Sequence, residues 1–143
     1  CVLCIDMNNS DDRKNLILFR GKFSFIIMNL YPYNNGHLMV CPYKHIASLS
    51  KLNEETLSEI MKLISKSSEI LRKTLNAEGF NIGANIGSVG GAGIDDHLHF
   101  HLVPRWKGDT NFMPVVGNTK VIMSGLHDTY DELFFHFQKG LAK

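Results

Sequence analysis

The segment that most restricts the fold is HLHFHLV, residues 97–103, in which histidines alternate with apolar residues. Successive side chains of a β-strand point to opposite faces of a sheet, so this period of two predicts a strand. The three histidines would share one face, and the apolar residues would anchor the other face in a core. Each neutral imidazole needs a hydrogen-bond donor and an acceptor, so three of them are poor core material. The pattern predicts a functional polar face; the plain alternative is three surface histidines on an exposed sheet.

Short apolar segments rich in β-branched and aromatic residues predict further strands. They span residues 16–20, 23–30, 37–42 and 80–86. Gly21 and Lys22 separate the first two segments as a hairpin, and a turn cluster at 32–36 precedes the third. The first three strands are therefore expected to form an antiparallel meander.

Two helices are also expected. Asn53 can cap the first helix, whose apolar residues recur at helical spacing from Leu57 to Leu75, with Gly79 as a stop signal. The second helix is expected over 127–139. Together these elements predict one α+β domain over residues 1–143, with an antiparallel sheet of about five strands, one long central helix and a C-terminal helix.

Composition narrows the functional classes. The net charge of +1 argues against nucleic acid or a membrane as a partner, and the hydrophobic fraction of 44% supports a packed core. Cys1, Cys4 and Cys41 are an odd number of cysteines, which favours reduced thiols or a metal over a disulfide framework, and hence the cytoplasm. Because the first residue is Cys1 rather than Met, the natural N-terminus is expected upstream.

The loop GSVGGAG, residues 87–93, precedes the histidine strand. Glycines allow backbone N–H groups to approach an anion closely, although a flexible connection would be the interpretation of this loop alone. Beside three histidines the loop becomes a candidate phosphate site. A neutral imidazole can attack phosphorus, and neighbouring imidazoles can orient it or donate to phosphate oxygens.

These residues resemble the histidine triad (HIT) family of nucleotide hydrolases and transferases. The triad has the family's form, and segments 29–46 and 79–105 look like its N-terminal segment and its core. Residues 106–115 (WKGDTNFMPV) are similar to the branch that includes bacterial diadenosine tetraphosphate phosphorylases and related hydrolases. The resemblance implies an α+β fold, a homodimer, and cleavage of dinucleoside polyphosphates at the α-phosphate without a catalytic cofactor.

The resemblance also implies roles for the histidines. His99, the middle histidine of the triad, would be the nucleophile and would form a nucleotidyl-histidine. His101 would lie near the phosphate oxygens, and His37 would line the same site. His97 is the first histidine of the triad and completes the expected catalytic set. His127 and His136 are instead interpreted as surface or packing residues.

Nucleotide contacts are implied in the same way. Asn29 matches a ribose-hydroxyl contact, and the residues that match the phosphate-holding loop are Asn85, Gly91, Ala92 and Gly93. Many members carry Gln-Ser or Gln-Thr where this chain has Ala92 and Gly93, so only backbone N–H contacts are expected there. No motif marks the residues that stack on the base; Ile5, Phe25 and Ile27 are guesses.

A second site is predicted at the N-terminus. Cys1 and Cys4 have the C-x-x-C spacing that chelates zinc, and two more ligands must come from elsewhere. His45 and His97 are the candidates, since a zinc-binding subset of the family uses equivalent positions. Such a Cys₂His₂ site would be structural. The alternative is two free thiols at a frayed end.

Several alternatives stay open at this point. The enzyme could instead hydrolyse nucleoside phosphoramidates, whose amine leaving group needs protonation. The chain could be a non-catalytic nucleotide-binding module, or the three histidines could ligate a catalytic metal. Within the leading hypothesis the second acceptor is either water or phosphate. Trp106 would pack at the substrate mouth or at a dimer surface.

Overall fold

The computed structural model describes residues 1–6, 11–109 and 125–141. Its elements, in chain order, are β1 (Ile17–Arg20), β2 (Ser24–Met28), β3 (Leu38–Pro42), the 3-10 turn η1 (Leu49–Lys51), α1 (Glu54–Thr74), β4 (Gly79–Gly83), the 3-10 turn η2 (Ser88–Gly90), β5 (Phe100–Arg105) and α3 (Leu126–Leu141). The expected polar segment 107–119 lies mostly outside the described residues.

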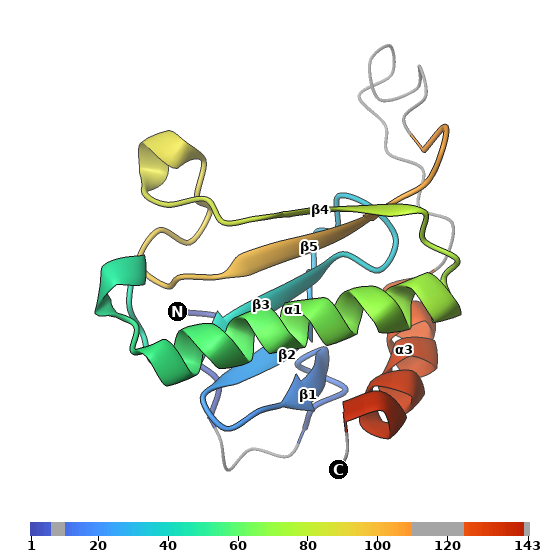
Figure 1. Cartoon of the computed structure of the whole chain (residues 1–143), viewed down its shortest axis with the longest axis horizontal. Coiled ribbons are helices and arrows are strands. Elements are labelled where there is room, and N and C mark those ends of the chain that lie inside the picture. The colour runs from blue at the N-terminus through green and yellow to red at the C-terminus, as the bar shows by residue number, and fades with distance from the viewer. Residues whose placement is uncertain (7–10, 110–124, 142–143) are drawn as a thin grey trace.

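The five strands form one antiparallel sheet in the order β1-β2-β3-β5-β4. The predicted meander of β1, β2 and β3 is confirmed, and β5 inserts between β3 and β4. Helix α1 runs across the sheet, and α3 packs against β1 and α1 (Figure 1). The predicted α+β class, with a long central helix and a C-terminal helix, is confirmed.

Helix α1 begins as the sequence predicted but ends earlier. The Asn53 side chain accepts a hydrogen bond from the backbone N–H of Thr56, which caps the first turn. The helix ends at Thr74 because Asn76 takes a left-handed conformation with a φ of 52°. Gly79 was expected to be the stop signal, and that prediction was wrong: Gly79 begins β4, opposite Arg105.

The histidine strand is shorter at its start than predicted. Strand β5 begins at Phe100, so His97 and His99 precede it. The reason is that the backbone N–H of Leu98 donates to the carbonyl of Ile46 at 2.7 Å, outside the β3–β5 ladder. The prediction of one strand carrying all three histidines was therefore wrong, and only His101 lies within the ladder.

Three other predicted strands keep their place with shifted ends. The strand expected over 23–30 is Ser24–Met28, and the one expected over 37–42 begins at Leu38. The strand expected over 80–86 begins at Gly79 and ends at Gly83. In each case the ladder stops where the flanking turn residues leave the sheet.

One row of side chains across the sheet positions the functional site. His101 on β5 pairs with Met39 on β3, Met39 pairs with Ile27 on β2, and Ile27 pairs with Ile17 on β1. Alternation places Ile26 and its β3 neighbours on the opposite face.

Within the described part of the chain, no helix has the length and apolar character needed to cross a membrane.

Candidate active site

A cavity of about 580 Å³ lies along the row that contains His101. Predicted site residues that line it are Asn29, Asn85, Gly91, Gly93, His99 and His101. Apolar side chains, among them Leu3, Leu16, Ile27 and Met39, line the remainder. A concave, mostly apolar pocket with a few convergent polar groups is the usual form of a small-molecule site.

The orientation of His99 leaves one ring nitrogen available as a nucleophile. Its Nδ1 lies 2.8 Å from the backbone carbonyl oxygen of His97. A carbonyl oxygen can only accept, so the proton of the neutral ring resides on Nδ1. The lone pair is therefore on Nε2. Because His99 is only 4% exposed and lines the cavity, that lone pair is held in a largely water-excluded site.

A hydrogen-bonded relay fixes the opposite tautomer in His101. The backbone N–H of Tyr33 donates to His37 Nδ1 at 3.0 Å, so the proton of His37 is on Nε2. That Nε2–H donates to His101 Nδ1 at 3.0 Å, which leaves the His101 proton on its own Nε2. His37 is fully buried and lies behind His101 rather than in the cavity wall. His101 can therefore offer an N–H donor where His99 offers a lone pair.

Burial keeps this part of the site uncharged. Desolvation lowers the pKa of His101 below its ordinary value, and the neighbouring His99 lowers it further. A neutral His101 is what the relay requires, since a protonated ring would present a second N–H to His37. The tautomers and the direction of the pKa shift agree.

The glycine loop lies at the histidine end of the cavity. Gly87 and Gly91 have positive φ angles of 74° and 84°, which L side chains rarely adopt. The Asn85 carboxamide donates to the Gly91 carbonyl at 3.2 Å and so holds the loop in place. Ala92 is not part of the cavity wall, and its N–H donates to the Gly87 carbonyl at 3.3 Å. The predicted phosphate contact of Ala92 is therefore not available in this conformation.

Asn29 and the guessed stacking residues separate in the structure. The Asn29 carboxamide oxygen accepts from the backbone N–H of Tyr31 at 2.9 Å, which leaves its amino group able to donate to a ligand. Of the guessed residues, Ile27 lines the cavity and Ile5 does not. Phe25 packs against Tyr43 instead, with ring centroids 5.2 Å apart.

Sequence reasoning missed several cavity residues. Tyr33 lines the cavity and its ring lies 4.6 Å from that of His37, between centroids. Met39 could have been found from the strand pairing, because it lies opposite His101. Leu3 lies within the C-x-x-C segment and Leu16 begins the first predicted strand, and no local pattern indicates that they meet at the site.

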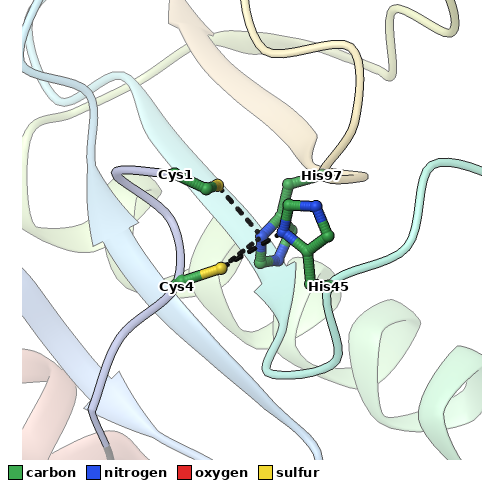
Figure 2. A group of neighbouring side chains, drawn as sticks. All are labelled: Cys1, Cys4, His45 and His97. Carbon is green, nitrogen blue, oxygen red and sulfur yellow. Dashed lines mark hydrogen bonds between the residues drawn. The ribbon is translucent and has the colours of Figure 1, made fainter.

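The second predicted site is also assembled. Cys1 Sγ lies 3.4 Å from His97 Nδ1, and Cys4 Sγ lies 3.2 Å from His45 Nδ1 (Figure 2). The four ligand atoms all lie within 4.8 Å of one another. The alternative of free thiols at a frayed end is not supported, because Leu3 between them is only 1% exposed.

The polar contacts of both histidines suit a metal ion. His97 Nε2 donates to the Pro42 carbonyl at 2.9 Å, so its Nδ1 lone pair points at the cysteines. His45 Nε2 lies 3.4 Å from an Asp96 carboxylate oxygen, an arrangement that orients a ligating imidazole. Burial lowers the pKa of His97, which favours the neutral ligand form. The residues present therefore fit a metal with two thiolate and two imidazole ligands.

By position, His97 thus belongs with Cys1, Cys4 and His45, a group of side chains that is called the metal cluster below. It is fully buried and does not line the cavity, although it was also predicted to be catalytic. Within the described ranges, the group of Cys1, Cys4, His45 and His97 is the sole cluster of three or more such side chains that could hold a metal. The alternative of a metal held by the three triad histidines is therefore not supported.

Comparison with known proteins agrees with this geometry. The HIT domain family matches residues 11–108. An AP-4-A phosphorylase from Mycobacterium tuberculosis is 42% identical over 118 residues, which are 82% of this chain and 60% of that protein. The chain therefore spans about 60% of the length of this curated relative. An uncharacterized HIT-like protein from Methanocaldococcus jannaschii is 31% identical over 109 residues, 76% of this chain and 81% of that protein.

Solved structures share the fold. A hypothetical histidine triad nucleotide-binding protein from Sulfolobus tokodaii matches with a TM-score of 0.72 and 25% identity over 98% of this chain and 91% of that one. A Zn-bound histidine triad family protein from Mycobacterium smegmatis matches with a TM-score of 0.70 and 21% identity over 87% of this chain and 84% of that one. The family match covers more than half of the sequence and includes the three triad histidines. The chain belongs to the HIT domain family.

Proposed function

We propose that the protein cleaves dinucleoside polyphosphates of the diadenosine tetraphosphate type at the α-phosphate, through a nucleotidyl group bound to His99. One observation carries this proposal: the His97 carbonyl holds the proton of His99 on Nδ1 and leaves Nε2 as a free base in the cavity. The 42% identity to a protein named AP-4-A phosphorylase supports the choice of substrate class.

The first step forms a nitrogen–phosphorus bond. The Nε2 lone pair of His99 attacks the α-phosphorus, and the bond from that phosphorus to the bridging oxygen breaks. The departing nucleoside polyphosphate takes the electron pair and needs no strong acid. The ring becomes cationic during this step, and the His97 carbonyl at 2.8 Å from Nδ1 stabilises the positive charge.

Neighbouring groups would bind the phosphate as charge develops. The Nε2–H of His101 can donate to a non-bridging oxygen, as can backbone N–H groups of the glycine loop near Gly93. The free amino group of Asn29 would hold a ribose hydroxyl. Apolar residues beyond Asn29 would enclose the base.

The second step transfers the nucleotidyl group to an acceptor and restores His99. We propose inorganic phosphate as that acceptor, because the relative at 42% identity is named a phosphorylase. Water remains the alternative, supported by a bis(5'-nucleosyl)-tetraphosphatase from Schizosaccharomyces pombe at 30% identity over 93 residues, which are 65% of this chain and 50% of that protein.

Product analysis tests the proposal. The protein is incubated with diadenosine tetraphosphate with and without inorganic phosphate, and adenosine 5'-phosphoramidate is assayed in parallel. ADP and ATP that form only with phosphate are expected, whereas AMP and ATP in its absence would identify water as the acceptor. Faster turnover of the phosphoramidate would favour the alternative enzyme. Micromolar nucleotide binding without any turnover by the folded protein would contradict the enzymatic proposal.

We also propose that the metal cluster holds a structural zinc ion, because two thiolates and two imidazoles are a preferred tetrahedral zinc set. Cys1, Cys4, His45 and His97 would be its ligands. A closed four-ligand site supplies folding stability and no open position for catalysis. Thiolate ligands also suit a reducing compartment, which supports a cytoplasmic location.

Two proposals concern the whole chain. Helix α3 buries Leu133 and Phe137 in the same core as the sheet, which supports a single domain over residues 1–143. Strand β4 is an edge of the sheet and its Ile82 is 52% exposed, which supports a homodimer formed by pairing along that edge. Light scattering after size exclusion tests the dimer: a mass near twice 16.1 kDa is expected.

A further inference from the structure

One end of the cavity is formed by a turn that the proposed chemistry does not use. The row from His101 through Met39 and Ile27 to Ile17 crosses four strands, or roughly 14 Å at about 4.8 Å per strand spacing. The turn over residues 11–16 precedes Ile17 and so lies at the β1 end, away from the histidines. Lys14, Asn15 and Leu16 from this turn line the cavity.

The turn is held by hydrogen bonds within it and to α3. The backbone N–H of Asn15 donates to the Asp11 carbonyl at 3.1 Å, and that of Ile17 donates to the Asp12 carbonyl at 2.8 Å. The Arg13 guanidinium forms two hydrogen bonds of 2.8 Å to the Asp131 carboxylate on α3. A group presented from such a turn is already ordered before a ligand arrives, which lowers the entropic cost of binding.

Backbone strain marks the same position. Leu16 has a φ of 58°, although it is a leucine with a side chain that is 5% exposed. A left-handed conformation of a non-glycine residue is unfavourable and persists where the surroundings impose it. The conformation orders the chain between Asn15 and β1, so it fixes how Asn15 meets the cavity.

Asn15 contrasts with the apolar walls around it. The side chains between this end and the histidines, including Leu3, Ile27 and Met39, are buried and apolar. Asn15 is half-buried, and its carboxamide forms no hydrogen bond with any other described residue. Leaving such a group without a partner on burial is costly, so a ligand that offers one donor and one acceptor side by side would be favoured.

We propose that the Asn15 carboxamide reads the edge of the purine base and determines base preference. This rests on the proposed function, which places the phosphate at His99 and the ribose at Asn29, so that the base extends toward β1. A carboxamide can accept from the adenine N6 amino group while donating to the adjacent ring nitrogen. The exposed Lys14 offers donors only and cannot make this pair.

Replacing Asn15 by Asp tests the proposal because a carboxylate only accepts hydrogen bonds. Asn15→Asp would repel the adenine ring nitrogen but could accept from the N1–H and amino groups of guanine. Calorimetry with AMP, GMP and ribose 5-phosphate measures the effect. The ratio of the Kd for AMP to that for GMP is expected to rise about tenfold or more, since a bidentate base pair is worth about 1–3 kcal/mol. Binding of ribose 5-phosphate, which has no base, is expected to stay unchanged.

Two further variants keep the test decisive. Asn15→Leu removes both polar groups without adding charge. It is expected to weaken the binding of AMP and to leave the binding of ribose 5-phosphate unchanged. Asn76→Asp adds the same charge at an exposed position that does not line the cavity, and it is expected to leave all three Kd values unchanged. Circular dichroism confirms that each variant is folded.

The proposal is overturned if Asn15→Asp changes the Kd of AMP, GMP and ribose 5-phosphate by one common factor, or changes none of them. An equal change caused by Asn76→Asp would also overturn it, because net charge would then explain the effect. Failure of the proposed function gives a different result: the unmodified protein would bind AMP without turning over diadenosine tetraphosphate, or would bind none of the three ligands.

Discussion

The proposed nucleophile His99 and the candidate zinc ligand His97 lie two residues apart in the chain, yet their imidazole rings are oriented in different ways. The His97 ring gives its Nε2–H to the Pro42 carbonyl and turns Nδ1 toward two sulfur atoms. The His97 carbonyl in turn accepts the Nδ1–H of His99 and leaves Nε2 free in the cavity. In both rings a backbone carbonyl selects the tautomer. The comparison teaches that the position of the accepting carbonyl, rather than the residue type, decides which ring nitrogen keeps its lone pair and whether that lone pair faces the two sulfur atoms or the cavity.

The largest expected effect comes from removing the proposed nucleophile. His99→Asn should lower kcat for diadenosine tetraphosphate by about a thousandfold or more, because no other ring among the described cavity residues offers a free Nε2. His127→Asn is the matched control, since His127 is exposed on α3. Steady-state kinetics measure both variants. Full turnover by His99→Asn would contradict the assignment of His99 as the nucleophile.

Metal removal should affect stability before chemistry. At a zinc concentration about a thousandfold above Kd, binding adds about 4 kcal/mol to the free energy of unfolding, so chelation or Cys4→Ser should lower Tm by roughly 10 °C. Cys41→Val is the control, because Cys41 is buried in β3 and is not one of the four candidate ligands. Differential scanning calorimetry with metal analysis measures the effect. A Tm that does not respond to chelation would contradict a structural metal.

Breaking the relay behind His101 should have a smaller effect than removing His99. His37→Leu leaves His101 Nδ1 without its donor, so the ring loses its fixed tautomer and orientation. A misplaced catalytic group costs up to about a hundredfold in kcat. Parallel measurement of kcat and KM should show the loss mainly in kcat. An unchanged kcat would mean that His101 does not depend on the relay.

The smallest expected effect is on the acid limb of activity. Burial and the neighbouring His99 lower the pKa of His101 below its ordinary value of 6.5, so this ring is still mostly neutral when the pH falls to 6.5. A lowered folded-state pKa means that the unfolded chain takes up the proton first, so stability from this group is complete above pH 6.5 and falls as the pH drops below it. A kcat–pH profile with its acid limb below pH 6.5 is expected. A limb centred above pH 6.5 would contradict a neutral His101.

Much of the fold could be predicted from local patterns. Short apolar segments located four of the strands, period-two alternation located the histidine strand, and the cap at Asn53 located the start of α1. The predicted ends of the strands and helices were less accurate, because these ends depend on contacts between residues distant in sequence. The bond from Leu98 to Ile46 delays β5, and the left-handed Asn76 ends α1 before Gly79.

The candidate site divides in a similar way. The motifs identified His99, His101, Asn29 and Asn85, which all line one cavity in the structure. The C-x-x-C spacing indicated the metal cluster. His97 was predicted for both sites, and the sequence could not choose between them, because the orientation of its ring depends on the Pro42 carbonyl, 55 residues away. The contribution of the 11–16 turn likewise arises from tertiary contacts that no local motif encodes.

Trapping the covalent state tests the central claim most directly. The protein is mixed with diadenosine tetraphosphate labelled in adenosine and quenched within one turnover in denaturing alkali, where a nitrogen–phosphorus bond survives. Peptide mapping by mass spectrometry then locates the label. An adenylyl group on Nε2 of His99 is the predicted result. Label on His97 or His101, or turnover with no label on the protein, would contradict the account.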